Sequence, residues 1–390
     1  MASQLREYFK DLKKTMKGKN NYFFLVNDSN NEILQHYDDG YESKFNIGKF
    51  KASQKAKMSY LRDNNINYKM FVVPDKSVIL RKYLPFDTNT PKRHIDSLHD
   101  FAYDALEVVN ENDYQVNDTH INMLASVKVV SFILSKMDKS KNIYDHARDL
   151  WDRLHIEISS DVKGDLFQDL NWSYPKDALY KKYSRVTFPV VVMNDECTQL
   201  DDIPDEFATF GSRKSIHIVN PNSVSDKKAL LLHDSSTLHM MPAFNTYYRE
   251  VFYYWDHWYF SKDLIKYFNP DDVIEVRTER FIDNALCPVF DDDTNVLIPV
   301  EVSFDKFTVN DDKLEVDISA EDLCKIKATS DFECLVDKSK VYSAKLDDGK
   351  ASFTISLDGI GEGSHEFNLI LMENERNSAR NIKKTFEVKI

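Results

Sequence analysis

Cysteine is scarce in this sequence, and the spacing of its cysteines excludes two kinds of site. The chain has four cysteines and no Cys-x-x-Cys pair, so neither a zinc knuckle nor a dithiol redox site is predicted. Cys324 and Cys334 could pair across two neighbouring strands. Free buried thiols are the alternative for all four positions, which are Cys197, Cys287, Cys324 and Cys334.

Glycine and long apolar runs are scarce as well. Only nine glycines occur, beside many Asn, Asp and Lys residues, which is typical of a polar, soluble globular protein. No apolar run is long enough to predict a transmembrane segment. Residues 4–16 predict a lysine-rich amphipathic helix without the apolar core that a signal peptide needs. We therefore expect a cytoplasmic chain as given, or a cell-envelope protein if an export signal has been removed.

Positive charge is the minority sign. The formal net charge of -13 argues against nucleic acid or an anionic membrane surface as the main partner. The charge does not select an acidic substrate either. At 390 residues the chain is long enough for two domains and a sizeable core.

The most informative stretch runs from Lys228 to His239. Its first part is apolar without alternation, which is typical of a strand buried on both faces of a parallel sheet. Asp234, Ser235 and Ser236 follow, and then a segment with helical spacing. A serine at such a strand-to-helix turn lies at the carboxyl end of a sheet, where the start of the helix could hold an oxyanion. The alternative is that these three residues only cap the helix.

The first three quarters of the chain alternate between strand and helix patterns, which predicts a parallel α/β sheet. The predicted strands are 21–26, 67–74, 185–193, 228–232, 251–255 and 272–276, and the predicted helices include 94–109 and the segment that follows Asn122.

The pattern changes after about Pro288. Short alternating runs between residues 300 and 390 predict an antiparallel sheet, most simply a small β-sandwich. We therefore divide the chain into an α/β domain at 1–290 and a β-sandwich at 297–390. The acidic run 291–293 is interpreted as a linker, with a calcium site as the alternative.

Asp118 and His120 could complete a site around Ser235. A serine hydroxyl needs a base to take its proton, and the base needs a carboxylate to fix its tautomer. In an extended segment residues i and i+2 point the same way, so Asp118 and His120 could face one cleft. The alternative is that Asp118 caps the next helix and that His120 is an ordinary surface or core histidine.

Five segments, taken in chain order, are similar to the motifs of one protein family. Residues 22–29 resemble the family's first strand, and residues 71–85 its Pro-Asp-Lys…Tyr-Leu-Pro segment. Residues 117–122 are similar to its Thr-Asp-Thr-His-Trp-Asn motif. Residues 228–235 resemble its strand that ends in Gly-Asp-Ser, and residues 269–280 its segment that ends in Glu-Arg. Over roughly residues 20 to 285 the chain thus resembles SGNH-hydrolase-like proteins of the alginate O-acetyltransferase type.

The resemblance implies a flavodoxin-like (SGNH-type) parallel sheet with helices on both faces. It implies Ser235 as the nucleophile, His120 as the base and Asp118 as the carboxylate that orients it. The implied activity is O-acetyl transfer or acetyl-ester hydrolysis on a cell-surface or capsular polysaccharide, through an acyl-serine. The implied partner is a polysaccharide or oligosaccharide substrate, held in part by a carbohydrate-binding C-terminal domain. The sequence identifies neither the acetyl donor nor which of the two reactions occurs, and no cofactor is predicted.

The sequence departs from the family pattern at His233, which stands where the family has glycine, and at Ile121, which replaces its Trp. His233 could donate to the oxyanion, or it could mark a site that has lost its chemistry. The rival hypothesis is therefore a non-catalytic glycan-binding or polysaccharide-assembly protein. The predicted oxyanion or substrate-binding residues are Asn122, His233, Ser236 and Arg280.

Aromatic residues gather between Tyr253 and Phe260, where a glycan platform and core packing are the two interpretations. Asp256 and His257 in this run form a rival carboxylate–imidazole pair. His120, His233, His239 and His257 have no spacing that supports zinc, so no metal is predicted.

Overall fold

The computed structural model describes residues 4–28, 30–43, 45–204, 207, 215–255 and 260–282, and strands between residues 303 and 388. The acidic run 291–293, the boundary between the two predicted domains and the Asp256–His257 pair lie outside the described residues. No helix within the described ranges is both long and apolar enough to cross a membrane.

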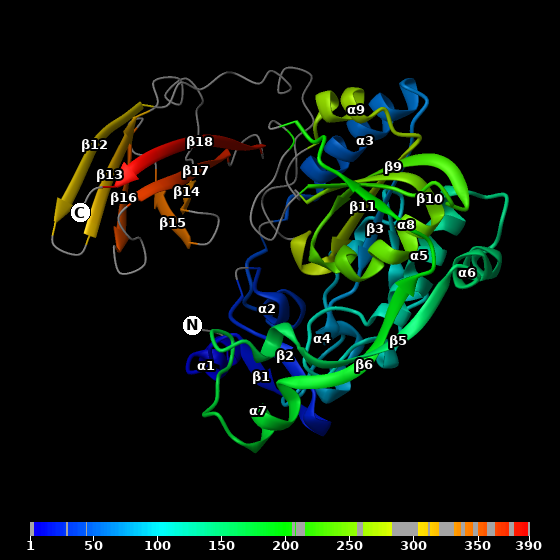
Figure 1. Ribbon diagram of the computed structural model, residues 1–390. Coiled ribbons are helices and arrows are strands. Elements are labelled where there is room, and N and C mark those ends of the chain that lie inside the picture. The colour runs from blue at the N-terminus through cyan, green and yellow to red at the C-terminus, as the bar shows by residue number, and fades with distance from the viewer. Residues whose placement is uncertain are drawn as a thin grey trace.

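The first part of the chain is built on a mostly parallel central sheet of seven strands, in the order β4-β3-β11-β9-β10-β8-β7. Figure 1 shows β3, β9, β10 and β11 of this sheet. The five strands from β4 to β10 pair in parallel, and β8 and β7 pair antiparallel at one edge. The strands are β3 Asn67–Val73, β4 Ala102–Asp104, β7 Thr198–Leu200, β8 Ile216–Val219, β9 Ser225–His233, β10 Tyr248–Tyr254 and β11 Asp272–Thr278.

Helices pack on both faces of this sheet because its middle strands are apolar on both faces. Ala229 and Leu231 of β9 join one buried cluster, with α5 (Met123–Met137), α6 (Ile143–Trp151) and α8 (Met241–Tyr247). Leu230 and Leu232 join a second cluster with α3 (Ile47–Asp63) and α9 (Lys262–Phe268). Side chains alternate between the faces of a strand, so an unbroken apolar run places a core on each side.

The strand predictions for the central sheet are confirmed for β3, β9, β10 and β11, and the helix after Asn122 is α5. Two other predicted strands form separate small sheets. The remaining elements are α1 Gln4–Phe9, β1 Thr15–Lys17, β2 Phe23–Leu25, α2 Glu32–Tyr37, α4 Lys76–Ile79, β5 Leu154–Lys163, α7 Ala178–Tyr183 and β6 Arg185–Met193, with β1 paired to β2 and β5 to β6.

The predicted helix at 94–109 is wrong. This segment forms short 3-10 turns on either side of β4, which adds a parallel edge strand beside β3. The Asp104 carboxylate accepts from the Leu106 amide at 2.9 Å and pairs with Arg93 at 2.6 Å. The pairing with β3 and the Arg93–Asp104 ion pair outweigh the local helical spacing. The helix predicted at 4–16 is too long for a similar reason, because it ends at Phe9 and residues 15–17 pair with β2.

The C-terminal strands form two antiparallel sheets. One has the order β12-β13-β16 and the other β15-β14-β17-β18. The strands are β12 Ser303–Asn310, β13 Lys313–Ser319, β14 Asp331–Val336, β15 Lys340–Lys345, β16 Lys350–Ser356, β17 Gly363–Glu373 and β18 Ser378–Val388. The sandwich, the domain bounds and the Cys324–Cys334 pairing stay predictions.

A buried ion pair joins α3 to the sheet. Lys57 Nζ lies 2.7 Å from Glu275 Oε2, and both side chains are almost fully buried. We expect Lys57→Met to lower the free energy of unfolding by ~3 kcal/mol, because it leaves the Glu275 charge without this partner. Urea denaturation measures this. Lys55→Met, at an exposed position of the same helix, is the control and should change little; equal effects of the two variants would contradict the prediction.

Candidate active site

Ser235 lies at the carboxyl end of β9, on the first residue of a 3-10 turn that runs from Ser235 to Met240. The fully buried Asp234 carboxylate holds this turn. It accepts hydrogen bonds from the Ser236 amide at 2.8 Å and from the Thr278 amide at 2.5 Å. Because Thr278 ends the neighbouring strand β11, Asp234 ties the serine turn to the end of the sheet.

The segment before α5 brings His120 and Asp118 to this serine. His120 Nε2 lies 2.9 Å from Ser235 Oγ, and His120 Nδ1 lies 2.7 Å from Asp118 Oδ1. The His120 amide also donates to Asp118 Oδ1 at 2.9 Å. Because a carboxylate only accepts, the Asp118 contact places the ring proton on Nδ1 and leaves Nε2 able to accept from the serine hydroxyl. The structure therefore brings together the three residues that the sequence pointed to.

The buried Lys76 binds the backbone of the segment that carries Asp118 and His120. Lys76 Nζ donates to the carbonyl oxygen of Asp118 at 2.8 Å and also to that of Gln115. Burial lowers the pKa of Lys76 to about 8, against the opposing effect of nearby carboxylates. The lysine thus satisfies backbone carbonyls that would otherwise be buried without donors.

Burial and ion pairing set the protonation of the base. Burial disfavours the charged form of His120, but the hydrogen bond and charge of Asp118 outweigh it and raise the pKa of His120. Burial alone would raise the pKa of Asp118. The hydrogen bond and the charge of His120 outweigh burial, so the pKa of this carboxyl is lowered. The pair is therefore arranged to stabilise an imidazolium beside a carboxylate.

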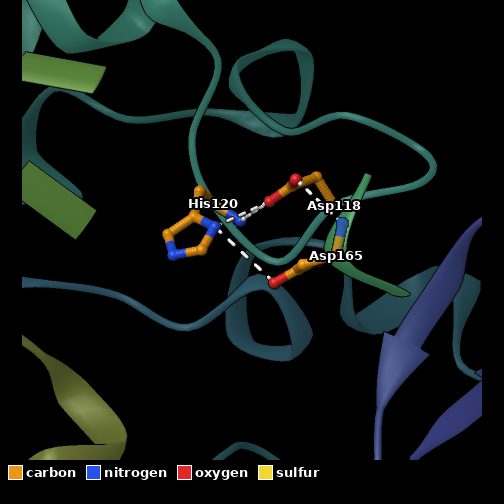
Figure 2. Close-up of side chains that lie close together, drawn as sticks. All are labelled: Asp118, His120 and Asp165. Carbon is orange, nitrogen blue, oxygen red and sulfur yellow. Dashed lines mark hydrogen bonds and ion pairs between the residues drawn. The ribbon is translucent and has the colours of Figure 1, made fainter. Parts of the chain in front are cut away.

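Asp165 is a second carboxylate at this site, and the sequence analysis missed it (Figure 2). Its Oδ2 lies 3.6 Å from His120 Nδ1. It comes from a 3-10 turn that is 46 residues away from Thr119 in the chain, so no spacing rule points to it.

The predicted oxyanion or substrate-binding residues have partners of different kinds. Both polar atoms of the Asn122 side chain already have partners. Its Oδ1 accepts from the Ala125 amide as the N-cap of α5, and its Nδ2 donates to the Asn112 carbonyl oxygen. Arg280 is buried and pairs with Asp75 at 2.6 Å. Ser236 is buried next to the serine turn, and its hydroxyl has no hydrogen-bond partner within the described part of the chain.

His233 is buried at the end of β9, where its Nδ1 lies 2.8 Å from the Asp234 carbonyl oxygen. Burial lowers its pKa to about 4, so the ring is neutral at pH 7. Its proton is then on Nδ1, and Nε2 carries a lone pair rather than a donor. A neutral ring held in this way is poorly suited to donate to an oxyanion.

Tyr253 and Tyr254 are buried, so these two residues of the aromatic run belong to the core rather than to a platform. Among the described residues, the side chains that could together hold a metal ion are Asp118, His120 and Asp165. A cation there would need the Nδ1 lone pair of His120, and therefore the opposite tautomer from the one that accepts the serine proton.

No family model matches the chain, and neither does any curated protein. Solved structures do match it. PatB1 from Bacillus cereus has a TM-score of 0.48 and 13% identity, covering 71% of this chain and 100% of that chain. A DHHW family protein from Eubacterium siraeum has a TM-score of 0.43 and 15% identity, covering 72% and 97%. The O-acetyltransferase domain of Pseudomonas putida AlgJ has a TM-score of 0.39 and 12% identity, covering 70% and 93%.

The bonds of Asp234 predict a large effect on stability. Asp234→Ala leaves the buried amides of Ser236 and Thr278 without their acceptor, so we expect the free energy of unfolding to fall by roughly 3 kcal/mol. Urea denaturation measures the change. Asp226→Ala, at the exposed start of the same strand, is the matched control and should change little. Two variants of equal stability would show that Asp234 does not anchor the turn.

Proposed function

We propose that this protein is a serine-dependent O-acetyltransferase or acetylesterase that acts on a polysaccharide through an acyl-serine. The observation that carries the proposal is the unbroken chain of contacts from Ser235 Oγ through His120 to Asp118, at 2.9 and 2.7 Å. Distances of this length are those required of a nucleophile, its base and the group that orients the base.

In the first half-reaction Ser235 Oγ attacks the acetyl carbonyl carbon while its proton passes to His120 Nε2. The tetrahedral intermediate then expels the donor alcohol, which takes the proton back from His120, and an acetyl-serine remains. In the second half-reaction the oxygen of an incoming hydroxyl group attacks the acetyl-serine while His120 Nε2 takes its proton. The intermediate then releases Ser235 Oγ, which recovers the proton from His120. Water as the acceptor gives hydrolysis, and a sugar hydroxyl gives transfer.

The oxyanion needs donors that are not already in use. The Ser236 amide donates to the Asp234 carboxylate, and the Thr237 amide donates to the Asp234 carbonyl. We therefore assign the first donor to the Ser235 amide, at the start of the turn, and expect others to become available when substrate binds.

The polymeric substrate is proposed from the family resemblance of the sequence. We further propose that residues 297–390 hold the glycan while the α/β part performs the acyl chemistry, which would add avidity without changing the reaction.

A non-catalytic glycan-binding protein is the rival proposal, and the replacement of the family's glycine by His233 is its support. His233 lies within β9, paired with Val276 of β11. A strand residue needs none of the unusual dihedral angles that favour glycine. The substitution therefore leaves the contacts of Ser235 in place, and these contacts favour the enzyme.

The triad predicts a non-additive loss of activity. Ser235→Ala and His120→Ala should each remove nearly all hydrolysis of p-nitrophenyl acetate, and the double variant should be little worse, because the residues act as one unit. Initial rates at matched protein concentration measure this. Ser160→Ala, at an exposed position of β5, is the control. Full activity in Ser235→Ala would refute the assignment of the nucleophile.

The raised pKa of His120 predicts the pH dependence of the reaction. Only the neutral imidazole can accept the serine proton, so kcat/KM should rise with pH as His120 loses its proton. Because Asp118 holds the pKa of His120 above its usual 6.5, the midpoint of this rise should lie above that value. A pH profile of kcat/KM corrected for spontaneous hydrolysis measures the midpoint. A midpoint clearly below 6.5 would contradict the predicted influence of Asp118.

A further inference from the structure

Asp165 contacts the segment 118–120 through hydrogen bonds as well as through its charge near His120. The Thr119 amide donates to Asp165 Oδ1 at 2.9 Å, and the Thr119 hydroxyl donates to Asp165 Oδ2. The Asp165 amide in turn donates to Asp118 Oδ2 at 3.2 Å. Asp165 therefore contacts the residue between the two triad members, and it uses the oxygen of Asp118 that His120 leaves free.

Gly164 makes this arrangement possible. A Cβ atom at position 164 would lie 2.0 Å from the carbonyl oxygen of Asn117, so no other residue fits without moving the backbone. The Leu166 amide donates to that same oxygen at 3.3 Å. The turn that carries Asp165 thus packs backbone against backbone on the segment that carries Asp118 and His120. Such a close approach is specific to glycine.

We propose that Asp165 is a second positioning carboxylate for the catalytic base. It fixes the 118–120 segment through Thr119 and Asp118, and its negative charge stabilises the imidazolium that forms when Ser235 gives up its proton. This inference rests on the proposed function. The two carboxylates would act on His120 in different ways. Asp118 accepts the hydrogen bond from His120 Nδ1, and Asp165 places a negative charge 3.6 Å from the same nitrogen.

The other charged and titratable groups around His120 define the background for this effect. Asp118 favours the imidazolium, while Arg280 disfavours it through its positive charge. The ring of His239 lies 5.8 Å from the His120 ring, with its Nδ1 bonded to the Ile121 carbonyl at 2.7 Å. Burial and the charge of Asp118 raise the pKa of Asp165, so the two carboxylates compete for ionisation. Removing the charge of Asp165 takes away one of the two negative charges that raise the pKa of His120.

Asp165→Asn tests the charge, and Thr119→Val tests the positioning contact with the charge kept. In the Asn variant we expect the pKa of His120 to fall by about one unit. On the high-pH plateau, where His120 is neutral in both proteins, kcat/KM for p-nitrophenyl acetate should fall roughly tenfold because the imidazolium that forms is less stabilised. In Thr119→Val we expect the pKa of His120 to stay within about 0.3 unit of its original value, since both carboxylates remain. Asp165→Glu, which restores the charge on a longer side chain, should recover part of the pKa.

The pKa of His120 should be measured by NMR titration of histidine ring signals, assigned by comparison with His120→Gln. Repeating the titration of each variant in a Ser235→Ala background makes this readout independent of turnover. If Asp165→Asn does not fold, as judged by its urea midpoint, Asp165→Ser is used with the same expectation. An unchanged pKa in the folded variant would overturn the role of Asp165. A lowered pKa in a protein without Ser235-dependent hydrolysis would support the coupling while refuting the proposed activity.

Discussion

The site depends on one buried carboxylate that joins two strand ends. The Asp234 carboxylate accepts hydrogen bonds from the Ser236 amide of the serine turn and from both the amide and the hydroxyl of Thr278. A parallel sheet brings its strand ends to one edge, but it does not fix the direction of the side chains that follow. The interactions of Asp234 fix the turn after β9 against the end of β11. Ser235 can therefore meet a base that comes from a different part of the chain.

His120 reaches Ser235 because the segment that carries it is held on two sides. Lys76, just after β3, binds backbone carbonyls of the segment, and Asp165 binds its Thr119. Both supports are buried or half-buried and charged, which is costly unless each charge meets donors or acceptors. The contacts that satisfy these charges are the same contacts that position Asp118 and His120. One set of interactions thus stabilises this segment and sets the geometry of Ser235, His120 and Asp118.

The sequence predicted the parts of this arrangement that depend on local pattern. An unbroken apolar run predicts β9, and the i, i+2 spacing of Asp118 and His120 predicts a shared orientation. It could not predict Asp165, because the contact joins two turns far apart in the chain through a glycine that packs on backbone. The prediction of a helix at 94–109 was wrong for a related reason. Its helical spacing is real, but pairing with β3 and the Arg93–Asp104 contact require partners that the local pattern does not contain.

His233 shows where the chemistry of the site can change without changing its geometry. Its ring packs against Tyr253 and Trp255 of the neighbouring chain segment, at ring-centre distances of 5.7 Å to each. The buried ring therefore fills space at the end of the sheet, and its only hydrogen bond within the described residues goes to the Asp234 carbonyl. That bond acts on the turn itself, at the residue just before Ser235. A change at position 233 would therefore reach Ser235 through Asp234, whose carboxylate ties the turn to the end of β11.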